Sequence, residues 1–203
     1  MGGSEQKYIQ DAFEKNWIAP LGENVTEFEN SVKAYTSSEA ALAVGSGTSA
    51  IHLALIEAGV ERDDIVFCSS LTFCASANPI MYQGAKPVFI DSENDSWNMS
   101  PVALRKAFEK FEGEGVKPKA VIAVNLYGQS SKIDEIKQIC DEYNVLLVED
   151  AAESLGAIYK GQKSGTFGHF GIFSFNGNKI ITTSGGGMLI SNDKEAIAHA
   201  LFL

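Results

Sequence analysis

The segment KAVIAVNLYGQSSKIDEIKQICDEYNVLLVEDA covers residues 119–151 and decides the fold class. It begins with an apolar run at 119–127, continues with an amphipathic pattern at 132–144, and closes with a second apolar run at 145–151. Neither apolar run alternates with polar residues, as expected for strands that helices cover on both faces. The order therefore predicts a strand, a helix and a parallel strand in an α/β sheet.

The same alternation extends outward from this unit. It predicts a mainly parallel, doubly wound α/β sheet of about seven strands with helices on both faces. Only about nine residues, GNKIITTSG, separate the final two strands; this is short for a crossover, so we expect the last strand to run antiparallel. Besides the segment above, the predicted strands are 41–44, 64–70, 86–91, 171–176 and 186–191, and the predicted helices are 48–59, 74–84 and 100–111.

The chain is expected to fold as a helical N-terminal segment, residues 1–35, followed by one large domain, residues 36–203. The first segment contains two helical patterns joined by the turn IAPLGEN. The final residues, KEAIAHALFL, have a helical pattern without a closing signal. We therefore expect the chain to be the front part of a longer protein.

Composition excludes several classes of function. The chain has 203 residues and a net charge of −10, so nucleic acid and anionic membranes are poor partners. No apolar run is long enough to span a bilayer, and the N-terminus lacks the apolar core of a signal peptide, so we expect a cytoplasmic protein. The cysteines and histidines have no metal-ligand spacing, and no metal site is expected; they are Cys68, Cys74, Cys140, His52, His169 and His199.

Ligands of such sheets bind beyond the carboxyl ends of the strands. After the first predicted strand, GSGTSA at 45–50 fits G-x-G-x-x-A. A nicotinamide site would also need an acid at the end of the second strand, which instead ends in serines at 69–70. The remaining interpretations are a phosphate cradle, in which Gly47, Thr48 and Ser49 open a helix N-terminus, or a tight turn capped by Thr48.

Other strand ends add an aromatic ring and carboxylates. Phe73 follows the second strand, as a core aromatic or as a flat face for a stacked ring. Glu149, Asp150 and Glu153 follow the apolar run VLLV. An ionised carboxylate at this edge needs a cationic partner, such as a protonated pyridine nitrogen, although Asp150 could instead cap the following turn.

The stretch SFNGNKIITTSGGGML, residues 174–189, places a single lysine, Lys179, in a glycine-rich turn between two strands. Ser174 ends the first of these strands. A phosphate cradle, a flat face, a carboxylate and a lysine amine together match the requirements of pyridoxal phosphate (PLP). The sequence therefore predicts that Lys179 forms the Schiff base with PLP, rather than serving as a solvated surface cation.

Several stretches resemble the DegT/DnrJ/StrS-type sugar aminotransferases, which share the aspartate aminotransferase fold (PLP fold type I). They occur in order along most of the chain and include SGTSAIHLAL, LTFCASANPI, VEDAAESLGA and GTFGHFGIFSFNGNKIITTSGGGML. EDAAES with NGNKIITTSGGGM is most similar to the branch that aminates C4 of UDP-4-keto-6-deoxy-N-acetylglucosamine on the bacillosamine route. Many relatives have TTGEGG where this chain has TTSGGG.

The resemblance implies roles for individual residues. Lys179 would form the Schiff base and move the proton, Asp150 would pair with the pyridine nitrogen, and Phe73 would stack on the ring. Glu153 would lie near the phenolic oxygen or the Schiff base, and Asn176 flanks the lysine as a further cofactor-binding candidate. The phosphate would be held by Gly47, Thr48, Ser49 and Ser174.

The resemblance also implies substrates and an assembly. The expected reaction moves an amino group from an amino acid, glutamate being the expected donor, to a keto-sugar nucleotide that the IAPLG loop would face. Members of the family work as homodimers and have a C-terminal domain that this chain lacks. The alternatives are a truncated PLP-binding module without turnover and a nicotinamide-binding domain.

Overall fold

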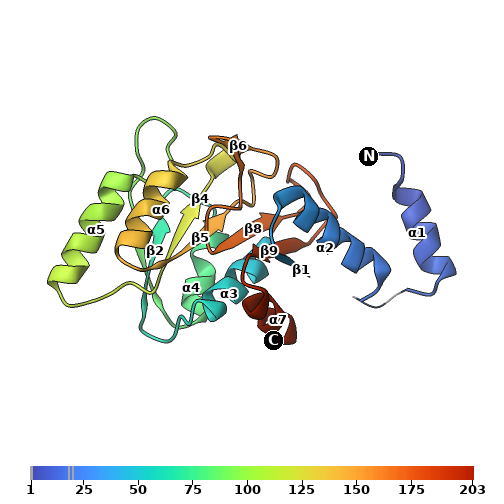
Figure 1. The fold of residues 1–203 in the computed structure, drawn as a ribbon, viewed down its shortest axis with the longest axis horizontal. Helices are drawn as coiled ribbons and strands as arrows, with labels where there is room; N and C mark the ends of the chain where they lie inside the picture. The colour runs from blue at the N-terminus through green and yellow to red at the C-terminus, as the bar shows by residue number, and fades with distance from the viewer. Residues whose placement is uncertain (1, 18, 20) are drawn as a thin grey trace.

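The computed structural model describes residues 2–17, 19 and 21–203, and its centre is a seven-stranded sheet in the order β1-β9-β8-β5-β4-β2-β3 (Figure 1). A separate two-stranded hairpin, β6-β7, was not predicted. The strands are β1 (Ala40–Val44), β2 (Ile65–Ser69), β3 (Lys86–Ile90), β4 (Ala120–Val124), β5 (Leu146–Asp150), β6 (Ile158–Tyr159), β7 (Gln162–Lys163), β8 (Phe170–Ser174) and β9 (Gly187–Ser191).

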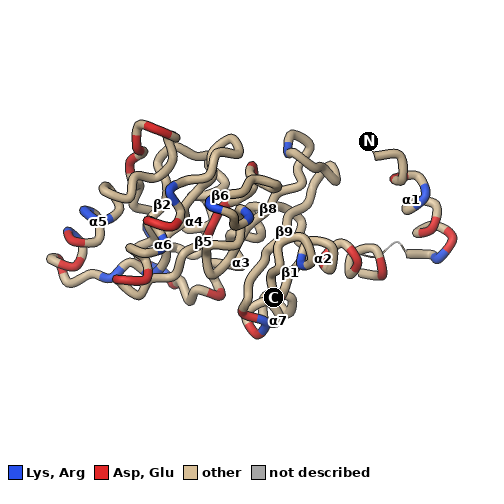
Figure 2. Tube along the Cα trace, turned by 45° about the horizontal axis from the view of Figure 1, so that its top comes forward, with Lys and Arg blue, Asp and Glu red and all other residues tan. Residues whose placement is uncertain are grey.

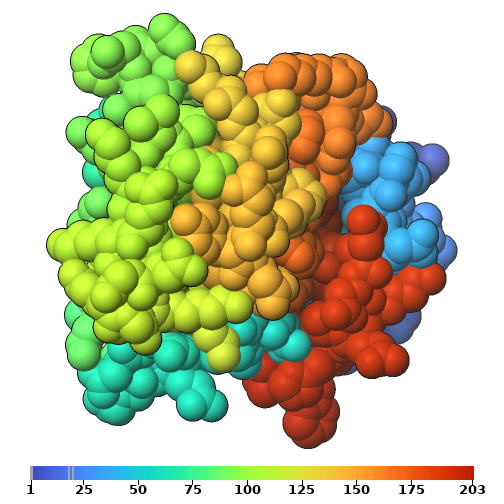
Figure 3. All heavy atoms as spheres, turned by 60° about the vertical axis from the view of Figure 1, so that its left-hand side comes forward, coloured from blue at the N-terminus to red at the C-terminus, as the bar shows by residue number. Residues whose placement is uncertain are grey.

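Strand directions confirm the doubly wound sheet. The neighbours β3, β2, β4, β5 and β8 are parallel, and β9 is antiparallel to both β8 and β1. The last strand thus runs as predicted from the short connection before it. Its pairing brings residues near the two ends of the chain together, and the blue α2 region lies beside the red C-terminal segment in Figure 3.

Helices cover both faces of this sheet, as expected from its apolar strands. One core joins α3, α4 and α7 to side chains such as Ile122 and Val148. The opposite face packs on α5 and α6 through side chains such as Val121 and Leu147, and on α2 near β8 and β9. The helices are α1 (Glu5–Glu14), α2 (Glu23–Thr36), α3 (Gly47–Glu57), α4 (Asn78–Tyr82), α5 (Pro101–Gly113), α6 (Ile133–Glu142) and α7 (Lys194–Phe202), with 3-10 helices η1 (Cys74–Ser76) and η2 (Leu126–Gly128).

Local signals explain where two helices begin. The Ser100 side chain accepts a hydrogen bond from the Ala103 amide at 3.2 Å, and Pro101 occupies the first helical position of α5. The helix predicted at 74–84 is divided, because Pro79 lies at the start of α4 and η1 precedes it. The regular α-helix therefore begins later than the pattern predicted.

The two N-terminal helices differ in their contacts. Helix α2 buries Val32 against β8 and β9, whereas α1 has no buried residue and lies apart from the sheet in Figures 1 and 2. The IAPLG loop lies between them, and its Ile18 and Pro20 are outside the described residues. Along the traced chain, basic residues are scattered among acidic ones (Figure 2). Among the described helices, none has both the length and the apolar character to cross a membrane.

Candidate active site

A cavity of about 340 Å³ opens at the carboxyl ends of β1, β2, β4, β5 and β8. Its walls come from the turns that follow these strands and from the residues just before β9. Parallel strands place their carboxyl ends on one edge, which explains why segments far apart in the sequence meet here. The predicted site residues that line it are Gly47, Thr48, Phe73, Asp150, Glu153, Ser174, Asn176 and Lys179.

The predicted phosphate cradle is the first turn of α3. Its N-cap is Ser46, not Thr48, and the Ser46 hydroxyl accepts a hydrogen bond from the Ser49 amide at 3.0 Å. Ser49 is not among the cavity-lining residues, and its hydroxyl lies 2.9 Å from that of Ser46. The earlier amides of the turn have no partner inside the helix, so the Gly47 and Thr48 end of α3 suits an anion.

Close packing brings Ser174 to this cradle. A Cβ built on Gly47 would lie 3.1 Å from the Cβ of Ser174, so only a glycine at this position fits without displacement of the serine. Gly187 lies against the same turn, opposite Val44 in β1 and Ser174 in β8. The helix end and the serine hydroxyl therefore lie on the same side of the sheet, as predicted.

Phe73 is not a core aromatic. It precedes η1, lines the cavity and leaves 70% of its surface exposed. Its ring forms a flat wall of the cavity, a surface on which another ring can stack. The stacking role predicted for Phe73 remains a prediction that this position allows.

Asp150 ends β5 and is buried at the base of the cavity. Its Oδ2 accepts a hydrogen bond from the Ser76 hydroxyl at 2.6 Å, and its Oδ1 accepts one from the Ala152 amide at 3.2 Å. Burial raises the pKa of Asp150, while the bond from Ser76, the Ala152 amide and the charge of Lys179 act in the opposite direction. The carboxylate is thus buried but not isolated.

Glu149 lies on the other face, because successive side chains of a strand alternate. Its Oε1 accepts hydrogen bonds from Asn125 Nδ2 at 2.9 Å and from the Gly165 amide at 2.8 Å. Its Oε2 accepts one from the Phe167 amide at 2.9 Å, and burial raises the pKa of Glu149. Glu149 therefore anchors the loop after β7 to the sheet through these hydrogen bonds, and it does not line the cavity.

Lys179 and Glu153 form an ion pair inside the cavity. Lys179 Nζ lies 3.1 Å from Glu153 Oε1, and the two side chains are 13% and 25% exposed. The other carboxylate oxygen of Glu153 accepts a hydrogen bond from the Tyr127 amide at 2.8 Å. This geometry places the amine of Lys179 within the cavity that Asp150 also lines, and Glu153 gives it an anionic partner.

The turn that carries Lys179 is fastened near both ends. The Phe175 amide donates to the Gly186 carbonyl at 2.9 Å, and the Lys179 amide donates to the Asn176 carbonyl at 3.0 Å. Asn176 Nδ2 donates to Asn178 Oδ1 at 3.1 Å, and both asparagines line the cavity. The asparagines therefore brace the turn, and a direct contact of Asn176 with a cofactor remains a prediction.

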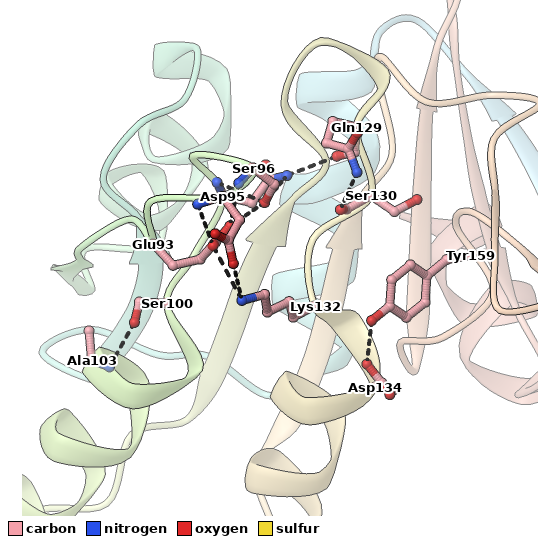
Figure 4. Close-up of polar contacts among 11 residues, drawn as sticks. Glu93, Asp95, Ser96, Ser100, Ala103, Gln129, Ser130, Lys132, Asp134 and Tyr159 are labelled. Atoms are coloured by element: carbon pink, nitrogen blue, oxygen red, sulfur yellow. Dashed lines mark hydrogen bonds and ion pairs between the residues drawn. The ribbon is translucent and has the colours of Figure 1, made fainter.

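A charged loop next to the site joins β3 to α5. The loop covers residues 91–100, and Lys132, which directly precedes α6, contacts it from a neighbouring segment. Lys132 Nζ lies 2.8 Å from Asp95 Oδ2 and 3.4 Å from Glu93 Oε2 (Figure 4). Hydrogen bonds from the Ser96 hydroxyl, from the Asp95 and Ser96 amides and from Lys132 lower the pKa of Glu93 to about 2. The anionic form of Glu93 therefore holds this loop together.

Asn98 links the 91–100 loop to the segment after β4, which lines the cavity. It is buried; its Oδ1 accepts from the Leu126 amide and its Nδ2 donates to the Gln129 carbonyl, both at 2.9 Å. These bonds fix the segment after β4, in which Tyr127 has a φ of 52°. The Tyr127 amide is the one that reaches Glu153, so the loop indirectly orients that carboxylate.

Sequence reasoning missed four groups that shape the site: the cap Ser46, the hydroxyls of Thr72 and Ser76, and the amide of Tyr127. The two hydroxyl residues lie in LTFCAS, directly after a predicted strand, so their position at the ligand edge was a usable signal. The contact of Tyr127 depends on its left-handed backbone, for which the sequence had no clear signal. Across the described residues, no group of His, Cys, Asp and Glu side chains could hold a metal ion.

The sequence matches the family model of the DegT/DnrJ/EryC1/StrS aminotransferases over residues 1–203. The chain belongs to this aminotransferase family. The match confirms the resemblance to the family and does not distinguish the branches within it. The chain spans about half the length of the curated relatives it matches: 52% of the first relative below.

Among curated relatives, the chain is 64% identical over 203 residues to EpsN of Bacillus subtilis (strain 168), provisionally assigned as a PLP-dependent aminotransferase; the match covers 100% of this chain. It is 39% identical to the GDP-perosamine synthase of Caulobacter vibrioides, covering 100% of this chain and 53% of that protein. It is 38% identical to the UDP-4-amino-4,6-dideoxy-N-acetyl-beta-L-altrosamine transaminase of Campylobacter jejuni, and the match covers 93% of this chain and 49% of that protein.

Solved structures agree with this assignment. A DegT/DnrJ/EryC1/StrS aminotransferase from Brucella abortus superposes with a TM-score of 0.90 at 32% identity. The superposition covers 98% of this chain and 56% of that chain. The α/β fold described above is therefore the fold of this part of the known aminotransferases.

Proposed function

We propose that this chain is the cofactor-binding part of a PLP-dependent aminotransferase that acts on a keto-sugar nucleotide. One observation carries the proposal: Lys179 and Asp150 line one cavity with an exposed aromatic face and an open helix N-terminus. This donor set fits PLP, whose phosphate, ring, pyridine nitrogen and aldehyde require these four kinds of group. The provisional assignment of EpsN supports the same cofactor.

Each residue then has a defined task. The amides at the start of α3, with the hydroxyls of Thr48 and Ser174, bind the phosphate, and Phe73 packs on the ring. Asp150 keeps the pyridine nitrogen protonated through its negative charge. When bound, PLP supplies an electron sink at the carbon that exchanges the amino group. Lys179 would hold the cofactor through its amine and would move a proton at the reacting carbon, and Glu153, 3.1 Å from the Lys179 Nζ, would orient that amine.

The substrate is proposed as a UDP-linked 4-keto-6-deoxy-N-acetylhexosamine with glutamate as amino donor. The motifs around Asp150 and Lys179 support this choice, and so does the name of the Campylobacter jejuni relative, a UDP-sugar transaminase. The GDP-perosamine synthases, of similar identity, define the competing nucleotide. Incubating the full-length enzyme with UDP- and GDP-linked keto-sugars and glutamate separates the two. The cytoplasmic location and the homodimer remain predictions.

The cofactor assignment is tested by borohydride reduction in the presence of PLP. We expect one covalent adduct, located by peptide mass spectrometry at Lys179, and none in Lys179→Ala. Lys160→Ala is a matched control, since Lys160 pairs with Asp134 on the exposed surface. Turnover by full-length Lys179→Ala, or an adduct at another lysine, contradicts the assignment. An adduct without turnover in the full-length enzyme identifies the protein as a PLP-binding module only.

A further inference from the structure

Two hydroxyl groups lie in line behind Asp150. Ser76, at the end of η1, is 1% exposed, and its Oγ lies 2.6 Å from Asp150 Oδ2. Thr72 Oγ1 lies 2.7 Å from Ser76 Oγ. Both residues belong to the segment after β2, line the cavity and are separated from Asp150 by 74 or more positions in the sequence. Their contact therefore depends on the assembled sheet edge.

The number of protons fixes the direction of these bonds. A serine hydroxyl has one proton to donate, and Ser76 donates it to the carboxylate of Asp150. Ser76 can then only accept from Thr72, which makes Thr72 the donor of the second bond. The chain of donors runs from Thr72 to Ser76 to Asp150. Such a chain favours the ionised carboxylate, because a protonated one would have less acceptor capacity to offer.

We propose that Ser76, supported by Thr72, is a positioning residue that holds Asp150 ionised and aimed into the cavity. The inference rests on the proposed function, in which the Asp150 carboxylate pairs with the pyridine nitrogen of the cofactor. It does not require the cofactor to be present, because the hydroxyl chain acts on Asp150 itself. Each carboxylate oxygen retains acceptor capacity beyond its bond to Ser76 or Ala152, so Asp150 can still receive a ligand proton.

The surroundings explain why Asp150 needs this support. Burial disfavours its charge and is the largest influence on its pKa. The other ionisable groups that affect it are Lys179 from the turn after β8 and Glu153 from the turn after β5. The neighbouring thiol of Cys68 in β2 is uncharged near neutral pH, because burial and the charge of Asp150 raise its pKa to about 12. Lys179 favours the carboxylate and Glu153 disfavours it, and these two form an ion pair with each other. The hydroxyl of Ser76 is the strongest favourable contact.

The test uses the cofactor-free protein first. The ¹³C NMR signal of the Asp150 carboxyl carbon, assigned by its loss in Asp150→Asn, is followed against pH. We expect Ser76→Ala to move the titration midpoint of Asp150 upward and Thr72→Val to move it less in the same direction. Ser191→Ala is the matched control, because Ser191 is a buried hydroxyl that donates to the His169 carbonyl at the opposite edge of the sheet. In Ser191→Ala, the titration midpoint of Asp150 should equal that of the wild type.

A second measurement links the bond to ligand binding. PLP affinity, followed by visible absorbance, should fall in Ser76→Ala, because a carboxylate that ionises less readily pairs less well with a protonated pyridine nitrogen. A rise of one pH unit in the Asp150 midpoint corresponds to a fall of about tenfold. Coinciding Asp150 midpoints in wild type and Ser76→Ala overturn the inference, whatever happens to stability. If Ser76→Ala does not fold, an unchanged midpoint in Thr72→Val overturns it. A wild type that forms no PLP adduct refutes the proposed function, while the NMR titration still decides the role of Ser76.

Discussion

Gly187 is the position at which an added methyl group should damage the cradle most. It begins β9, between Val44 of β1 and Ser174 of β8. A Cβ built there would lie 2.3 Å from the carbonyl carbon of Ser46, 2.4 Å from its oxygen and 2.5 Å from the amide nitrogen of Gly47. All three atoms are backbone, so no side chain can rotate away, and the turn before α3 must move by about 1 Å to restore an ordinary contact.

The expected cost follows from this displacement. Overpacking typically costs about 1–3 kcal/mol, and because all three contacted atoms are backbone, the cost of Gly187→Ala should lie at the upper end, about 3 kcal/mol. For a domain of this size, about 2–4 °C of melting temperature corresponds to each kcal/mol, so Tm should fall by about 6–12 °C. Because the amides of the first turn of α3 shift with Ser46 and Gly47, PLP should also bind more weakly.

Circular dichroism melting and a PLP titration measure the two effects. Gly113→Ala is the matched control: a Cβ there meets no atom within 4 Å, and the residue ends α5, away from the cavity. Its melting temperature should stay level or rise slightly, since alanine restricts the unfolded chain. A Gly187→Ala protein that melts within about 2 °C of wild type, and binds PLP equally well, refutes the close-approach argument.

Two further perturbations test charges at and near the cavity. Asp150→Asn should leave the protein at least as stable near neutral pH. Burial raises the pKa of Asp150, so ionising this carboxyl as pH rises lowers the free energy of unfolding of the wild type, and the neutral asparagine avoids that cost. In the full-length enzyme the same change should slow turnover by more than tenfold, and a loss below about threefold would place the pyridine partner elsewhere. Glu93→Gln should lower the free energy of unfolding in urea near neutral pH. The pKa of Glu93 is lowered to about 2, so its contribution to the free energy of unfolding is complete above about pH 4.5 and is lost toward pH 2. The free energies of unfolding of the two proteins should therefore converge on acidification. A difference that stays constant with pH would contradict this.

Most of the sheet followed from the sequence because its signals are strong and local. Continuous apolar runs marked the seven strands of the central sheet, and the short GNKIITTSG connection gave the direction of β9. The β6-β7 hairpin was missed because two-residue strands have no periodicity to detect. The order of the strands, with β9 between β1 and β8, depends on long-range pairing that a local pattern does not encode.

The site was predictable where residue type and strand end coincided. Asp150 ends a strand, Phe73 and Lys179 follow strands, and all three line the cavity. The alternative interpretation, a turn capped by Thr48, is excluded because Ser46 caps α3; either hydroxyl could start the helix, and only the backbone geometry decides. Ser76 was overlooked because its partner, Asp150, is distant in sequence and meets it only in the folded sheet.

The position of β9 also constrains how the protein emerges from the ribosome. The Glu39 amide donates a hydrogen bond to Asn192 Oδ1 across 153 positions, and β1 is an edge strand whose neighbour in the described sheet is β9. During synthesis, β1 therefore stays unpaired until β9, residues 187–191, has been made. Such late, non-local pairing slows folding and leaves strand edges open to misassembly, so binding of PLP to translation intermediates should begin only after β9 has left the exit tunnel.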